Sequence, residues 1–102
     1  MNLEKAKRLS KRCIEISPDE PAYQDTYGWI LYKLGEHAEA EKWIKKAVNS
    51  SRSNPVILEH YGDVLFHINQ KKEAIKYWKK AKSAGGLSEI LNKKIKEGVF
   101  YE

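Results

Sequence analysis

The chain has 102 residues, enough for one domain with a single continuous core. Hydrophobic residues make up 41% and charged residues 32%, with six Gly and three Pro, a balance that excludes disordered and fibrous proteins. The net charge of +5 comes from the C-terminal third, where residues 71–97 carry nine Lys against three Glu. The apolar runs are too short for a transmembrane segment, and the single cysteine excludes an internal disulfide.

The sequence repeats itself at a spacing of 34 residues. The matched pairs are Pro21/Pro55, Tyr27/Tyr61, Gly28/Gly62, Leu31/Leu65, Glu39/Glu73, Ala40/Ala74, Lys42/Lys76, Lys45/Lys79, Lys46/Lys80 and Ala47/Ala81. A further shift by the same distance aligns Ala6 with Ala40 and Lys11 with Lys45. Such periodicity is typical of repeat proteins, and it divides the single domain, residues 1–102, into a half-repeat over 3–18 and full repeats over 21–54 and 55–88.

Each full repeat is predicted to contain two antiparallel helices. Pro21 and Pro55 suit the first turn of a helix, because that turn does not use the missing N–H, and Asn54 suits the N-cap position. Gly35 and Asn69 tolerate a left-handed backbone, so the first helices should end just before them.

The second helices are predicted over 38–51 and 71–84. Their apolar residues recur at intervals of three and four, which indicates one buried stripe: Ala40, Ile44 and Ala47 in the first unit, Ala74, Trp78 and Ala81 in the second. Glycine in mid-helix costs about 1 kcal/mol relative to alanine. We therefore expect Gly28 and Gly62 to allow close approach of the small residues on the second helix.

A last helix is predicted over 87–97. Leu87, Ile90, Leu91 and Ile95 would share one face, with Lys93, Lys94 and Lys96 largely on the others. A helix that is apolar on one side and polar on the other can cover the end of a helical stack.

The Tyr-Gly-x-x-Leu pattern and the small residues that follow it, repeated every 34 residues, resemble the tetratricopeptide repeat. The resemblance covers nearly the whole chain and implies an all-α fold, in which antiparallel helix–turn–helix units stack as a short right-handed solenoid with a C-terminal capping helix. The sequence also resembles the C-terminal repeats of larger bacterial proteins of this family. An N-terminal half-repeat would expose Leu3, Leu9 and Ile14 and favour homo-oligomers.

The resemblance also implies a protein or peptide partner, bound on a concave groove formed by the first helices. The residues expected there are Asp25, Trp29, Tyr32, Lys33, Glu59, Asp63, Phe66 and His67. Acidic and aromatic side chains suit an extended segment that carries Lys or Arg. Alternatively, the rings simply pack against neighbouring helices. Some members of the family hold the C-termini of chaperones with a clamp of basic residues. The acidic residues expected in this groove do not fit such a clamp.

We find no pattern for catalysis, a small-molecule substrate or a cofactor. Cys13 takes the place of Ala47 and is predicted to be a small buried thiol rather than a nucleophile. Gly85-Gly86 matches no phosphate-binding loop. One helical face would carry His60, Asp63 and His67, residue types that can bind a metal ion. The two histidines are seven residues apart, about 10.5 Å along the helix axis, which argues against one metal ion between the imidazoles. The sequence predicts a protein that is not an enzyme and holds no metal.

Three functions remain open from the sequence. The preferred one is a scaffold for protein–protein interaction through the groove. The second is a structural cap of a longer solenoid, with self-association through the N-terminal helix. The third is binding of nucleic acid or an anionic membrane by the C-terminal lysines. Two observations argue against it: the outward position of Lys76, Lys79 and Lys80, and the scarcity of Arg.

Overall fold

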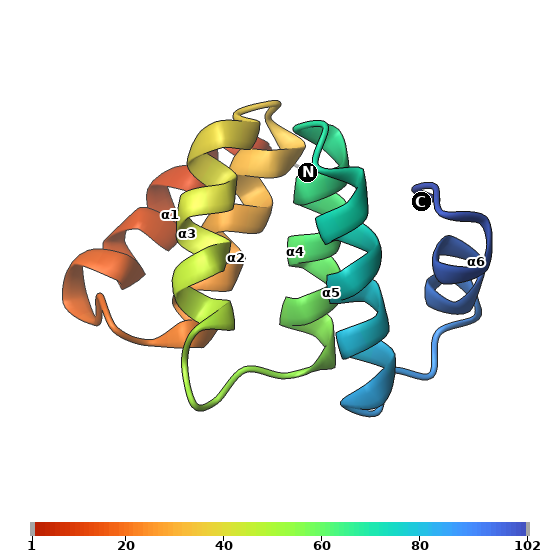
Figure 1. The fold of residues 1–102 in the computed structure, drawn as a ribbon. Coiled ribbons are helices and arrows are strands. Elements are labelled where there is room, and N and C mark those ends of the chain that lie inside the picture. The colour runs from red at the N-terminus through yellow and green to blue at the C-terminus, as the bar shows by residue number, and fades with distance from the viewer. Residues whose placement is uncertain (1, 102) are drawn as a thin grey trace.

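The computed structural model describes residues 2–101 and contains six α-helices and no strand in that range. The helices are α1 (Leu3–Ile16), α2 (Pro21–Lys33), α3 (His37–Val48), α4 (Pro55–His67), α5 (Lys71–Ser83) and α6 (Glu89–Glu97). Figure 1 shows them stacked from α1 at one end to α6 at the other, with α2 paired with α3 and α4 with α5. The predicted all-α repeat solenoid is confirmed.

The helix boundaries follow from the residues at each end. Proline opens α2 and α4, and the Asn54 side chain accepts a hydrogen bond from the Ile57 N–H at 3.0 Å. After these helices the chain turns through left-handed residues, Gly35 at φ +85° and Asn69 at φ +66°. Helix α3 ends at Val48, earlier than expected, and the Ser50 hydroxyl then accepts the backbone N–H of Arg52 in a local turn.

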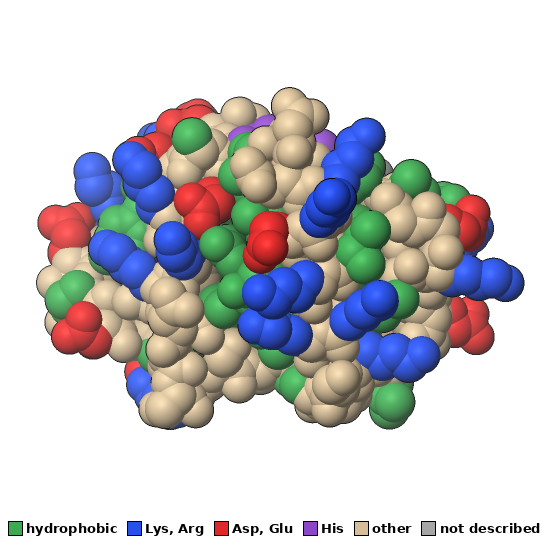
Figure 2. Space-filling view, in the orientation of Figure 1, with side chains coloured by type: hydrophobic (Ala, Val, Ile, Leu, Met, Phe, Trp, Pro, Cys, Tyr) green, Lys and Arg blue, Asp and Glu red, His purple; other side chains and the backbone are tan. Residues whose placement is uncertain are grey.

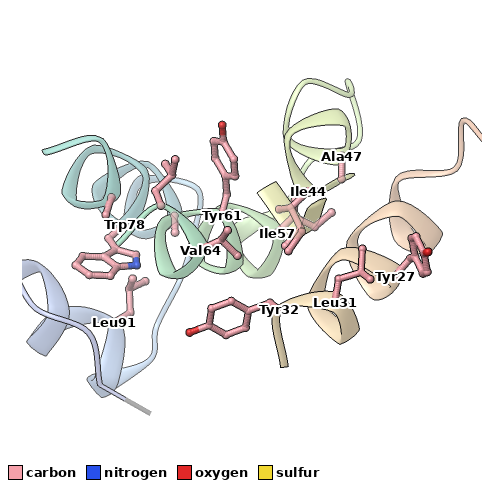
Figure 3. Close-up of a cluster of buried hydrophobic side chains, with 14 of the residues drawn as sticks. Tyr27, Leu31, Tyr32, Ile44, Ala47, Ile57, Tyr61, Val64, Trp78 and Leu91 are labelled. Carbon is pink, nitrogen blue, oxygen red and sulfur yellow. The ribbon is translucent and has the colours of Figure 1, made fainter. Parts of the chain in front are cut away.

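The core lies between the first and second helices of each unit, and Figure 3 shows its side chains converging there. The largest fully buried side chains are Trp78, Leu31, Ile44, Leu91 and Val64. A Cβ atom on Gly28 would lie 3.2 Å from the Ala40 carbonyl oxygen, and one on Gly62 would lie 3.1 Å from that of Ala74. The two glycines therefore allow the close helix approach that the sequence predicts.

Helix α6 continues the 34-residue register as the first helix of a third unit. Ser88 Oγ accepts the Leu91 N–H at 3.2 Å, as Asn54 accepts that of Ile57, and both of these apolar residues are buried. Lys96, however, stands where the earlier units have Gly28 and Gly62. An added Cβ at Gly28 or Gly62 would clash with the following helix, so Lys96 lacks the feature that permits this close approach in the earlier units.

Three expectations about the helical ends need correction. Helix α6 begins at Glu89 rather than residue 87, because Ser88 caps it, and Leu87 is 90% exposed. Lys94 is 3% exposed rather than outward, since it takes the place of His60 and faces the preceding unit. Ile14 is buried against the core, whereas Leu9 remains 55% exposed.

Cys13 is half-buried rather than fully buried like Ala47. Helix α1 has the position of a second helix, and within residues 2–101 only α2 packs extensively against it, whereas α3 packs against both α2 and α4. The outer side of α1, including part of Cys13, is therefore left uncovered.

Candidate functional site

A hollow of about 330 Å³, called the groove below, opens where α2, α4 and α6 meet the C-terminal residues. Helix α2 contributes Trp29 and Lys33, and α6 with its N-cap contributes Ser88, Ile90 and Lys94. The complete lining is Trp29, Lys33, Val56, Glu59, His60, Asp63, Ser88, Ile90, Lys94, Phe100 and Tyr101. The groove is thus walled by the first helices of three successive units.

Between α2 and α4, His60 lies between an acidic and an aromatic side chain. His60 Nδ1 is 3.0 Å from Asp25 Oδ1, and the imidazole stacks on the Trp29 ring with centroids 3.8 Å apart and planes at 16°. Asp25 is buried, so its carboxylate is directed to His60 and not to the opening. One face of Trp29 is therefore covered by the protein itself.

Between α4 and α6, Lys94 fills the equivalent position. Its Nζ lies 2.8 Å from Glu59 Oε2 and 2.8 Å from Asp63 Oδ1, and Trp78 Nε1 donates to the same Asp63 oxygen at 3.0 Å. Burial raises the pKa of the Asp63 carboxyl, and the hydrogen bonds from Lys94 and Trp78 only partly offset this effect. The charges at the base of the groove are therefore paired within the chain.

The two arrangements are copies of one contact between units. His60 and Lys94 are 34 residues apart, as are their acidic partners Asp25 and Glu59. In each, a basic side chain from the following unit is held by a carboxylate of the preceding one. The repeat register consequently places an internal partner beside each of these carboxylates.

Aromatic rings extend the groove on one side. Tyr32 Oη lies 3.0 Å from His67 Nδ1, and the His67 ring makes an edge contact with Phe100, their centroids 4.7 Å apart. Phe66 stacks on Phe100, with centroids 6.5 Å apart, and His37 lies beside His67 at 5.5 Å. His37 thus joins a cluster of rings.

The structure separates the eight residues expected in the groove into three groups. Trp29, Lys33, Glu59 and Asp63 line the groove itself. Asp25 lies beside it on His60 and lines an adjoining hollow. Tyr32, Phe66 and His67 belong to the neighbouring rings.

The sequence analysis missed the part of the lining contributed by α6 and the residues after it. Lys94 and Phe100 are the equivalents of His60 and Phe66 at the same 34-residue spacing. Extending the repeat alignment beyond residue 88 would have indicated both positions.

Other kinds of site find little support in the described part of the chain. No group of three or more His, Cys, Asp and Glu within residues 2–101 is arranged to hold a metal ion. Among the helices of that range, none has the length and apolar character needed to cross a membrane. The groove is therefore the feature to compare with known proteins.

Comparison with known proteins identifies the repeat. Residues 23–54 match the tetratricopeptide repeat family, and the crystal structure of TTC0263, a thermophilic TPR protein from Thermus thermophilus, superposes with a TM-score of 0.80. Residues 23–54 therefore form a repeat of the tetratricopeptide type. The chain is 21% identical to TTC0263 over 94% of its own length and spans about half (49%) of that longer chain. No curated protein sequence matches it.

Tetratricopeptide repeats are in general non-enzymatic scaffolds for protein–protein interaction. The low identity to TTC0263 establishes the fold alone, so the partner must be argued from the groove.

Proposed function

We propose that this tetratricopeptide-repeat chain binds a segment of a partner protein in the groove, with an apolar or aromatic side chain as the main anchor. The observation that carries the proposal is the lining: Trp29, Phe100 and Tyr101 provide rings, and Ile90 provides an aliphatic wall. Burying such rings gives large apolar contact areas at low conformational cost. Val56, 58% exposed, extends the apolar surface at the edge.

The charges favour a segment that is neutral where it lies deepest. Glu59 and Asp63 are already paired with Lys94, so a Lys or Arg of the partner would have to displace a buried lysine to reach them. Lys33 lies exposed on the lining and can pair with a carboxylate of the partner. The geometry therefore supports an apolar anchor with a nearby acidic group better than the basic segment expected from the sequence.

The experiment that tests this function is selection of peptides from a displayed random library on the purified chain, followed by affinity measurement. Val56→Asp/Ile90→Asp should weaken the selected peptides by at least about tenfold, because both changes place charge on the apolar wall. Ile16→Asp is the matched control, since Ile16 is an exposed apolar residue at the end of α1, away from the groove. It should change affinity by less than about twofold.

Peptides that bind the groove variant as tightly as the wild type would contradict the proposal. Circular dichroism and thermal unfolding check that each variant is folded. Both residues of the groove variant are exposed, so a large loss of stability is not expected.

A second candidate function is supported by Lys96. Lys96 stands at the position that is glycine in the two earlier units, so a further helix could not pack as closely on α6. Helix α6 therefore suits a structural cap of a longer solenoid. The two functions are compatible, because the groove lies on the first helices whereas the cap acts at the end of the stack.

A further inference from the structure

A second hollow, of about 680 Å³, runs along one side of α5. Its residues recur at intervals of three and four and so form one helical stripe. Four of them are Lys72, Lys76, Lys79 and Lys80, and Ile75 lies between them. We call this hollow the lysine groove; Figure 2 shows Lys and Arg side chains gathered over the part of the surface formed by α5.

Helix α6 covers less of α5 than α4 covers of α3. Helix α4 has 13 residues and its Tyr61 donates to Glu41 of α3 at 2.7 Å, whereas α6 has only nine. The residue in the place of Glu41 is Ile75. A Cβ added at Gly98, the residue after α6, would lie 3.4 Å from Ile75 Cδ1.

The positive charge of α5 is only slightly offset within the helix, by Glu73. It carries six Lys and one Glu, whereas α3 carries three Lys and two Glu. Lys72/Lys76 and Lys76/Lys80 are like-charge pairs four residues apart, which destabilise a helix, and Lys72 in the first turn is unfavourable with the helix dipole. The packing of α5 does not require these charges, because its buried side is made by Ala74, Trp78 and Ala81.

The matching hollow on α3 carries charges of both signs. Glu39 and Glu41 both line it together with Lys42, Lys45 and Lys46. Within residues 2–101, the lining of the lysine groove includes no carboxylate. The two hollows share the repeat register, so the absence of carboxylates from the lining is a property of α5 and not of the fold.

We propose that the lysine groove binds an acidic segment of a partner protein, separately from the groove on the first helices. Carboxylates of the segment pair with Lys76, Lys79 and their neighbours, and an apolar side chain between them contacts Ile75. The hollow is open and lies along one helix, so a polypeptide segment can contact its whole length. The lining contains neither Arg for bidentate phosphate contacts nor an aromatic ring for base stacking, which disfavours nucleic acid.

A membrane surface is also disfavoured by the position of the exposed apolar residues. Leu87 is the most exposed large hydrophobic residue of the described chain, but it lines a different hollow together with Val56 and Gly85. Peripheral membrane binding combines basic residues with apolar side chains that insert beside them.

The test uses a fluorescein-labelled helical peptide of about 18 residues, with Glu on one face around a central Leu, and measures anisotropy at low and high salt. Lys76→Glu/Lys79→Glu is compared with Lys42→Glu/Lys45→Glu, which makes the same charge change at the equivalent positions of α3. Lys76 and Lys42 each face a Glu three residues earlier, so the variants are matched in that respect too. Each substitution lies on the outer side of its helix, away from the buried stripe, and both variants should fold.

The expected result is salt-sensitive binding by the wild type, weakened at least about tenfold in the α5 variant and less than about twofold in the α3 variant. Equal weakening in the two variants, or no binding to the wild type, would overturn the proposal. Parallel measurements use vesicles of phosphatidylcholine with one-fifth phosphatidylserine and a 20-nucleotide single-stranded DNA. Tighter binding of either one than of the peptide would also overturn it.

Discussion

Lys94 Nζ lies 2.8 Å from Asp63 Oδ1, and both side chains are buried beneath α6. Because removing one partner leaves an uncompensated buried charge, Lys94→Met should lower the free energy of unfolding by about 3–5 kcal/mol at neutral pH. Urea denaturation measures the change. Lys93→Met is the control, since Lys93 is exposed on the same helix, and it should cost less than about 0.5 kcal/mol. Equal costs would show that the buried pair has no special role.

The cost of Lys94→Met should depend on pH. Burial already raises the pKa of Asp63, and loss of the lysine raises it further. A carboxyl whose folded-state pKa exceeds its unfolded value favours folding most below the unfolded pKa, and this advantage is lost as pH rises through the folded pKa. The stability difference between variant and wild type should therefore shrink as pH falls from 7 towards 4. A difference that grows on acidification would contradict this assignment.

Gly62→Ala should destabilise the protein by about 1–3 kcal/mol, because the new methyl group would overlap the Trp78 ring and press on the Ala74 carbonyl. Gly35→Ala provides a comparison with a different cause: no atom lies within 4 Å of its Cβ position, but φ is +85°. Its cost should be about 1–2 kcal/mol from backbone strain alone. Trp78→Phe, which makes room, should reduce the cost of Gly62→Ala and leave that of Gly35→Ala unchanged in double-variant unfolding measurements.

Asn69→Gly should stabilise the chain by up to about 1 kcal/mol, because Asn69 follows α4 with φ +66° and glycine adopts that conformation without strain. Asn69→Ala should have the opposite sign. Thermal unfolding of the two variants gives the measurement. If both changes moved the midpoint in the same direction, backbone conformation would not be the governing factor at this turn.

Self-association, if it occurs, should depend on α1. Leu9 is 55% exposed and Ile16 82% exposed on this helix, and only α2 packs extensively against it in the described chain. Leu9→Asp/Ile16→Asp should abolish any concentration-dependent increase in sedimentation coefficient. Val99→Asp, at the opposite end of the stack and 39% exposed, is the control and should leave it unchanged. Persistence of the oligomer in the α1 variant would exclude this surface.

The groove shows where prediction from the sequence succeeds and where it stops. Residues of α2 and α4 were predictable, because a helix presents the same face at each repeat, and Trp29, Lys33, Glu59 and Asp63 do line the groove. Their availability was not predictable. Whether a carboxylate is open to a partner depends on which side chain of another helix reaches it, and Lys94 comes from 31 residues further along the chain than Asp63.

The helices, their pairing and their close approach follow from the amino-acid sequence alone. The 34-residue period, the prolines and the mid-helix glycines act through local geometry and nearest-neighbour packing, which repeat from unit to unit. Burial of Lys94 and its pairing with Glu59 and Asp63 depend instead on how the helices pack in three dimensions. These outcomes depend on contacts at the end of the stack. Within residues 2–101 no helix follows α6, and the repeat register alone does not determine burial or charge pairing there.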